Sequence, residues 1–311
     1  MLRFLLSRMF SAALVVVGVS SIVFLMIHLV PGDPVEVMLG ESAQAADREA
    51  LRHALGLDQP LWQQFQTFIY HLIRLDFGVS LYSQQPIGAM LWERFPATLQ
   101  LALAGLCVAV AIALPLGVVA ALHRGQRWDR MAMSFALLGV SIPNFWLGPL
   151  LILLFSLWLG WLPVSGREGA LSLILPALTL GTAMASILSR MIRATLLEVL
   201  HEDYIRTARA KGLTETAVIF RHALRNALLP VITLLGLQLG TLLGGAVITE
   251  MVFSWPGLGQ LTIESIHRRD YPVLQASILL ISISYVLVNT LTDIVYGWLD
   301  PRIRLAGGRH G

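Results

Sequence analysis

Six apolar stretches without a single Asp, Glu, Lys or Arg limit what this chain can fold into. An α-helix needs about 20 apolar residues to cross the ~30 Å hydrocarbon core of a bilayer, and each stretch is about that long or longer. The sequence therefore predicts an all-α integral membrane protein with six transmembrane helices. The expected spans are residues 9–30, 98–122, 131–159, 170–189, 227–249 and 273–292.

The composition also favours a membrane protein. Charged residues make up 13% of the 311 residues, whereas a soluble domain carries about 25%. Cys107 is the single cysteine, which excludes an intrachain disulfide and a metal site built on cysteines. The first stretch follows Arg3 and Arg8, but it is too long for a signal peptide and lacks a cleavage site of small residues. We expect it to be retained as the first span.

The distribution of basic residues predicts the orientation in the membrane. If the N-terminus is cytoplasmic, 15 of the 22 Lys and Arg residues fall on the cytoplasmic side of the expected spans. Cytoplasmic segments of membrane proteins carry an excess of these residues. Both termini are therefore expected in the cytoplasm.

The segment between the first two spans is too long to be a simple connection. Apolar residues recur at helical spacing in residues 47–55 and 61–75, and these runs are interrupted by Gly and Pro. We expect an N-terminal segment with the first span at residues 1–30, a small helical extracytoplasmic insertion at 31–97, and a core of five helices at 98–311. A hairpin that lies on the membrane surface is the alternative for the insertion.

Polar side chains within the spans are candidates for the lining of a transport pathway, because they would cost free energy if they faced lipid. Gly236, Gly240 and Gly244 recur every four residues, which places a smooth stripe on one face of the fifth span. Such a stripe serves either helix packing or a pathway. The candidate pathway-lining residues are Ser141, Asn144, Gln238, Gly240 and Asn289.

Catalytic motifs are absent from the sequence. A P-loop requires Gly-x-x-x-x-Gly-Lys-[Ser/Thr], and the only lysine, Lys211, lies between Ala210 and Gly212. His201 and Glu202 begin a zinc-binding HExxH pattern, but Ile205 stands where its second histidine is needed. We expect no catalytic, cofactor-binding or metal-binding residues, and a protein that is not an enzyme. The spans also carry no charged residue, so proton coupling within this chain is not expected.

Residues 198–228 form a long charged interval between the fourth and fifth spans. The residues up to Lys211 favour a helix, and Gly212 is a suitable C-terminal stop. Thr214 can cap a second helix with Glu215 in its first turn, and this helix would lead into the fifth span.

Tyr204, Ala208 and Lys211 share one face of the first helix of this interval. On that face, the small side chain of Ala208 would let the backbone seat closely in the groove of a partner protein. The alternative is a basic helix that lies on anionic lipid headgroups.

The same interval resembles the cytoplasmic "EAA" loop of bacterial ABC importer permeases, through YIRTARAKG at residues 204–212 and HALRNALLP at 222–230. More narrowly, the chain resembles the B-type permeases of dipeptide, oligopeptide, glutathione and nickel importers. Further matching motifs follow in order: LVPGDP at 29–34, GLDQPL at 56–61, LDFGVS at 75–80, SIPNFW at 141–146, LGWLP at 159–163, FSWPGLG at 253–259, RDYPV at 269–273 and DPRIR at 300–304. The resemblance implies the type I ABC importer permease fold.

The resemblance also implies that residues 198–228 dock on a partner that hydrolyses ATP. Ala208 matches the second alanine of the EAA pattern and Gly212 matches its glycine, whereas Arg206 stands where the pattern has glutamate. The implied ATPase-coupling residues are Tyr204, Arg206, Thr207, Ala208, Lys211 and Gly212.

The partners implied by the resemblance are a second homologous permease that forms a heterodimer, two ATP-binding subunits that hold ATP and Mg, and a periplasmic substrate-binding protein. We expect the chain in the bacterial inner membrane, surrounded by lipid, with no nucleic acid partner. The expected cargo is a di- or oligopeptide or glutathione, with a nickel chelate as the alternative. The expected contacts with the binding protein are Trp255, Pro256, Arg269 and Asp270.

The competing hypothesis from another class is a self-sufficient channel or secondary transporter. It predicts flux through the purified chain alone, whereas the importer hypothesis predicts none without ATPase subunits. A membrane enzyme is a third hypothesis, and it lacks a catalytic motif.

Overall fold

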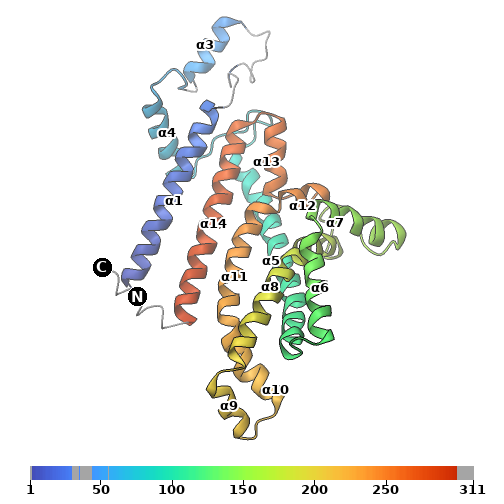
Figure 1. The fold of residues 1–311 in the computed structure, drawn as a ribbon. Coiled ribbons are helices and arrows are strands. Elements are labelled where there is room, and N and C mark those ends of the chain that lie inside the picture. Colours follow the sequence, from blue (N-terminus) through green and yellow to red (C-terminus); the bar gives the residue numbers. More distant parts are fainter. Residues whose placement is uncertain (1, 30–34, 36–43, 55, 300–311) are drawn as a thin grey trace.

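The computed structural model describes residues 2–29, 35, 44–54 and 56–299. Within these ranges the regular structure is helical, apart from an isolated β-bridge between Val79 and Pro86 (Figure 1). The prediction of an all-α protein is confirmed. Most of the LVPGDP motif, at residues 30–34, and the DPRIR motif at 300–304 lie outside the described residues.

Among the described residues, five helices are long and apolar enough to cross a membrane. They correspond to the first, second, fourth, fifth and sixth predicted spans, and α5 begins eleven residues before residue 98, the expected start of its span. Their bounds are α1 (Leu2–Leu29), α5 (Ile87–Leu122), α8 (Ile174–Val199), α11 (Leu224–Gly245) and α14 (Tyr271–Leu299).

The third predicted span is not a straight helix. It consists of α6 (Arg127–Ser141) and α7 (Asn144–Leu151), which continues as the π-helix η1 (Ile152–Trp158), and the two parts meet at an angle of 100°. The bend lies at Ile142 and Pro143, because a residue that precedes proline is driven into an extended conformation, and Ile142 has φ −96° and ψ 115°. The chain has six crossings only if this bent pair counts as one span.

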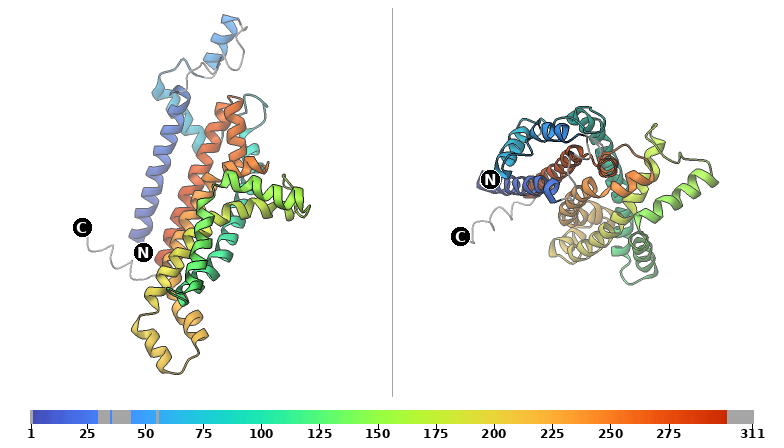
Figure 2. Two further views of the ribbon diagram at one scale, coloured as in Figure 1. Left: turned by 45° about the vertical axis from the view of Figure 1, so that its right-hand side comes forward. Right: turned by 90° about the horizontal axis from the view of Figure 1, so that it is seen from above.

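Figure 2 shows α1 at the edge of the bundle, whereas α8 packs against α5, α6 and α11. The backbones of α8 and α5 approach closely where both helices have glycine. A Cβ atom on Gly181 of α8 would lie 2.8 Å from the carbonyl oxygen of Gly105 of α5, too close for a side chain. In the most apolar part of the span that contains α8, 61% of the residues are buried. In the most apolar part of α1 the buried share is 17%. The α1 helix is therefore peripheral, and it packs on α14.

Short helices occupy the two ends of the bundle. At one end, which we call the insertion end, lie α3 (Ala45–Ala54) and α4 (Leu61–Ile73) (Figure 1). At the other, the hairpin end, lie α9 (Asp203–Ala210) and α10 (Glu215–Ala217) (Figure 1). The remaining elements are the 3₁₀-helix η2 (Leu171–Leu173), the π-helix η3 (Val218–Ala223), α12 (Val247–Val252) and α13 (Leu258–His267).

Candidate functional site

The candidate docking site is the hairpin formed by α9, the turn at Lys211 to Thr214, and α10. Gly212 has a φ of +75°, a left-handed conformation that favours glycine, and it ends α9 as predicted. The Oγ1 atom of Thr214 accepts a hydrogen bond of 3.4 Å from the backbone N–H of Ala217, so the predicted cap is confirmed. From α10 the helix continues through η3 into α11, so the hairpin is directly joined to a membrane-spanning helix.

One face of α9 is buried against the same chain. Ile205 is fully buried and Ala208 is 7% exposed, and α9 packs on η3. In this structure Ala208 therefore faces its own chain, and its coupling role stays a prediction. Ile205 and Ala208 lie three positions apart on one helix face, and the small Ala208 lets α9 approach its own neighbour η3.

The outward face of the hairpin is polar. Tyr204 is 39% exposed, and the other predicted coupling residues that remain exposed are Arg206, Thr207, Lys211 and Gly212. This face therefore presents basic and small residues around the glycine turn.

Exposed hydrogen bonds brace the hairpin. The Arg209 guanidinium donates from Nε to Glu215 Oε1 at 2.8 Å and from Nη2 to Oε2 at 3.3 Å, across the turn. The Nδ2 atom of Asn226 donates to the Tyr204 hydroxyl at 2.8 Å. These contacts join α9 to α10 and to the start of α11.

The glycine stripe of α11 is a packing surface within the chain. A Cβ atom on Gly240 would lie 3.0 Å from Cδ2 of Tyr285 and 3.2 Å from Oδ1 of Asn289, both on α14. A Cβ atom on Gly236 would overlap Thr292 of the same helix. In this structure α14 covers Gly240, and a role for Gly240 in a pathway stays a prediction. Asn289 lies against this contact, and its buried Oδ1 has no hydrogen-bond partner within the described residues.

The other candidate pathway residues lie on two different parts of the bundle. Ser141 and Asn144 flank the α6–α7 bend, where the exposed Ser141 hydroxyl donates to the carbonyl oxygen of Leu137 at 2.9 Å. Gln238 lies two residues from Gly236 and Gly240, so the helical period places it away from the stripe that faces α14. A role of these three residues in a pathway stays a prediction.

Two of the four predicted contacts with a binding protein are buried. Trp255 is fully buried, and its Nε1–H donates to the carbonyl oxygen of Ala97 at 2.8 Å. Asp270 is buried and accepts hydrogen bonds from the Ser80 hydroxyl and the Leu81 backbone N–H. Both side chains hold the fold together in this structure, and their role in contact with a binding protein stays a prediction.

Pro256 and Arg269 are the other two predicted contacts with a binding protein, and both reach the surface. Pro256 is half-buried and Arg269 is exposed. A role for them in binding another protein stays a prediction.

Sequence reasoning missed a buried carboxylate, Glu250 of α12. It is fully buried, and its Oε1 accepts a hydrogen bond of 2.7 Å from Thr98 Oγ1 of α5. Its Oε2 accepts one of 3.0 Å from the backbone N–H of Gln260, and Thr98 Oγ1 accepts one of 2.8 Å from Leu258 N–H. We call Glu250, Thr98, Leu258 and Gln260 the insertion-end anchor. The available signal was an acid that directly follows an apolar stretch and precedes two closely spaced glycines.

A second buried carboxylate, Asp129 of α6, lies at the hairpin end. Arg193 of α8 donates from Nε to Asp129 Oδ1 and from Nη2 to Oδ2, both at 2.7 Å. The backbone N–H of Gly125, in the turn after α5, donates to Oδ2 at 2.8 Å. We call Asp129, Arg193 and Gly125 the hairpin-end anchor. Its signal in the sequence was a single acid among the basic residues between the second and third stretches.

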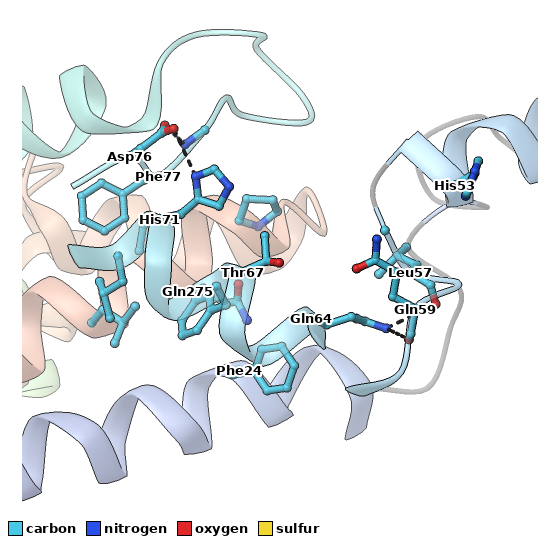
Figure 3. A pocket seen from close by; sticks show the side chains of 17 residues that line it. Phe24, His53, Leu57, Gln59, Gln64, Thr67, His71, Asp76, Phe77 and Gln275 are labelled. Atoms are coloured by element: carbon cyan, nitrogen blue, oxygen red, sulfur yellow. Dashed lines mark hydrogen bonds and ion pairs between the residues drawn. The ribbon is translucent and has the colours of Figure 1, made fainter. Parts of the chain in front are cut away.

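A cavity of about 580 Å³ lies at the insertion end, between α1, α4 and α14 (Figure 3). Its wall includes Phe24 of α1, whose ring lies 5.6 Å from that of Phe68, centroid to centroid. Gln275 of α14 lines the cavity and donates from Nε2 to the carbonyl oxygen of Val23 at 2.8 Å. His71 lies 3.2 Å from Asp76, Nδ1 to Oδ2. These contacts join α4 of the insertion to α1, and α1 to α14.

The sequence matches two protein families, each over a different part of the chain. Residues 113–305 match the family described as "Binding-protein-dependent transport system inner membrane component". Residues 1–102 match the family of N-terminal segments of the same membrane components. Together the two matches leave only short parts of the chain uncovered.

Curated relatives match along nearly the whole chain. The glutathione transport system permease protein GsiC of Escherichia coli strain K12 is 45% identical over 304 residues, which cover 98% of this chain and 99% of the relative. GsiC of Salmonella paratyphi A has the same identity and coverage.

A solved structure resembles the fold. The MetNI methionine ABC transporter in an inward-facing conformation superimposes with a TM-score of 0.59 at 24% identity. The match covers 70% of this chain and 99% of the transporter chain. At this identity the likeness bears on the fold alone, and it agrees with the predicted type I permease fold.

Proposed function

Because this chain belongs to the inner membrane components of binding-protein-dependent transport systems, we propose that it is the peptide- or glutathione-carrying permease subunit of an ABC importer. The single observation that carries the proposal is the hairpin of α9 and α10. It stands exposed between α8 and α11, two helices long enough to span a membrane, and so offers a docking surface joined to the spans. The chain is a transport subunit, and the energy comes from partners that bind ATP and Mg.

We assign the docking of an ATP-hydrolysing partner to the outward face of the hairpin. Arg206, Thr207, Lys211 and Gly212 are exposed there, and Tyr204 is partly exposed. Ala208 acts from beneath this face by seating α9 on η3. The docking partner thus moves α9, and α9 moves α11 through η3.

The basic residues support a cytoplasmic position for the hairpin and both termini, since Lys and Arg are enriched on that side of a membrane. ATP is available on that side. The insertion end then faces the periplasm, where a substrate-binding protein meets it, with Pro256 and Arg269 as exposed candidates for contact. A second homologous permease completes the pathway, to which Ser141, Asn144 and Gln238 contribute.

The proposed cargo is glutathione or another short peptide. The support is the 45% identity to permeases named for glutathione transport. The test is uptake into liposomes that contain this chain, its partner permease and the ATPase subunits, with the binding protein added outside. We expect ATP-dependent uptake of radiolabelled glutathione. Uptake of a nickel chelate in preference to peptides would overturn the cargo, and flux through the purified chain alone would overturn the importer itself.

Gly212→Asp tests the hairpin assignment. A Cβ atom at Gly212 meets open space, but the φ of +75° disfavours a side chain by about 1 kcal/mol. We expect uptake and ATPase binding to be lost while the protein still inserts in the membrane, as measured by uptake and by co-purification of the ATPase subunits.

Gly169→Asp is the matched control for this variant. Gly169 also has a positive φ, of 99°, and open space around its Cβ position, but it lies away from the hairpin, before η2. We expect it to transport normally. Equal loss in both variants, or normal uptake by Gly212→Asp, would contradict the assignment.

A further inference from the structure

The two anchors join α5 to α8, which leads into the hairpin, and to α12, which follows the helix that leaves the hairpin. The hairpin-end anchor ties the turn after α5 to α8 through Asp129 and Arg193. The insertion-end anchor ties α5 to α12, which directly follows α11, through Thr98 and Glu250. The contacts form a closed circuit. It runs from the hairpin through the last turns of α8 to the turn after α5, along α5 to Thr98, across to α12, and back along α11 to the hairpin.

The insertion-end anchor is built from neutral donors around one carboxylate. Glu250 and Thr98 are both buried. Each carboxylate oxygen receives a donor, from the Thr98 hydroxyl and from the Gln260 backbone. The Thr98 hydroxyl accepts from the Leu258 backbone in turn, so a single side chain of α5 holds α12 and α13 together.

Glycine makes room for this carboxylate. A Cβ atom on Gly257 would overlap the Glu250 carboxylate. A Cβ atom on Gly259 would lie 2.9 Å from Glu250 Oε2 and 2.7 Å from Cα of Val247. The turn between α12 and α13 is therefore shaped around Glu250, and it cannot close in the same way on a larger turn residue.

The segment that Glu250 holds also contacts other parts of the insertion end. The backbone N–H of Gly166 donates to the carbonyl oxygen of Phe253 at 2.9 Å. A Cβ atom on Gly148 of α7 would lie 3.0 Å from Cγ1 of Val252. A displacement of α12 relative to α5 would therefore reach α7 and the loop before η2.

We propose that Glu250 is a positioning residue for transport, which with Thr98 passes movement between the hairpin and the insertion end. This inference rests on the proposed function, because it assigns the movement of the hairpin to ATP-hydrolysing partners. The observation that carries it is the closed circuit, in which the Glu250–Thr98 hydrogen bond joins α5 to α12, beside the hydrogen bond from Trp255 to Ala97.

Thr98→Val tests the link, since valine has the shape of threonine without the hydroxyl. Thr98→Ser is the matched control, because serine keeps the hydroxyl. In the assembled complex with ATPase subunits, the measurements are complex yield, basal ATP hydrolysis, and hydrolysis stimulated by substrate-loaded binding protein. We expect Thr98→Val to keep the complex yield and the basal rate of ATP hydrolysis. Its stimulated rate increase should be about tenfold smaller, the size expected for the loss of a hydrogen bond to a charged group. Thr98→Ser should retain the stimulation.

Glu250→Gln provides a second variant of the same link. The amide oxygen can still accept from the Gln260 N–H, but the NH₂ group then faces Thr98 Oγ1, so the Thr98 hydroxyl no longer donates to residue 250. We expect the double variant Glu250→Gln with Thr98→Val to lose no more stimulation than the more affected single variant, because both changes break one link.

Two outcomes would overturn the inference. One is full stimulation in Thr98→Val. The other is a loss of yield, basal rate and stimulation in equal proportion, which would show a role in folding alone. Failure of the proposed function is distinguishable, because the unaltered complex would then show no stimulation by any loaded binding protein.

Discussion

Two buried carboxylates near opposite ends of α5, Asp129 and Glu250, are held by different chemistry. Asp129 has a cationic partner, Arg193, whose side chain is 29% exposed. Glu250 is fully buried and is held by a hydroxyl and a backbone amide. Arginines are abundant in the segments near the hairpin end. Their long side chains can pair with a buried acid while part of the guanidinium still reaches water. At the insertion end the carboxylate depends on close-fitting neutral donors.

The comparison teaches that the two anchors respond differently to substitution. An anchor built on close fit is sensitive to added volume, because neighbouring atoms have no space to move into. An anchor built on charge is sensitive to loss of the ionic partner, but water reduces the cost. Substitutions at each anchor therefore test the comparison directly.

Gly257→Ala should have the largest effect on stability. Its Cβ atom would overlap the Glu250 carboxylate, and overpacking of this kind costs about 3 kcal/mol. We expect a lower midpoint of thermal unfolding for the purified protein in detergent. The matched control is Gly244→Ala, whose Cβ atom would meet Ile281 Cγ2 at an ordinary 3.6 Å. An equal midpoint for the two variants would show that the turn around Glu250 is not tightly fitted.

Asp129→Asn should destabilise less than Gly257→Ala. The asparagine NH₂ group would face donors of Arg193 or Gly125, which now donate to both carboxylate oxygens. Because Arg193 reaches water, the loss of its partner should cost less than in a fully buried ion pair. We expect the free energy of unfolding to fall by about 2 kcal/mol. Thermal unfolding measures the change.

The control for Asp129→Asn is Asp203→Asn, which removes the exposed partner of Arg206. It should leave the unfolding midpoint nearly unchanged, as expected for a surface ion pair. If Asp129→Asn is as mild as this control, the hairpin-end anchor contributes no more than a surface contact.

Glu215→Gln should have the smallest effect on stability. The carboxylate of Glu215 pairs with Arg209 across the hairpin turn, where both side chains are well exposed. An exposed pair contributes about 0.5 kcal/mol, and less at high salt. The measurement is the unfolding midpoint at low and high ionic strength. If Glu215→Gln lowers the unfolding midpoint strongly at both ionic strengths, this exposed pair contributes as much to stability as the buried anchors, and the comparison fails.

The sequence predicted the features that depend on neighbouring residues. The helical class and the spans follow from long apolar stretches, because hydrogen bonds within a helix satisfy its backbone in lipid. Gly212 and Thr214 end and begin helices through contacts within a few residues. The bend at Pro143 was present in the sequence as well, but its angle of 100° depends on how α7 packs.

The sequence did not show which face of an element the fold covers. Ala208, Gly240, Trp255 and Asp270 were assigned to partners or a pathway, and each is buried against its own chain. Helical spacing shows which residues share a face, but it does not show which neighbour covers that face.

By itself, the sequence determined a helical membrane protein with a charged hairpin between two spans, and its motifs indicated the importer permeases. Only the tertiary structure decided that Glu250 meets Thr98, 152 positions away, and that Asp129 meets Arg193, 64 positions away. The physical reason is that a buried carboxylate must find its donors wherever the packing of helices brings them. That packing depends on contacts between distant segments, which no local pattern in the chain records.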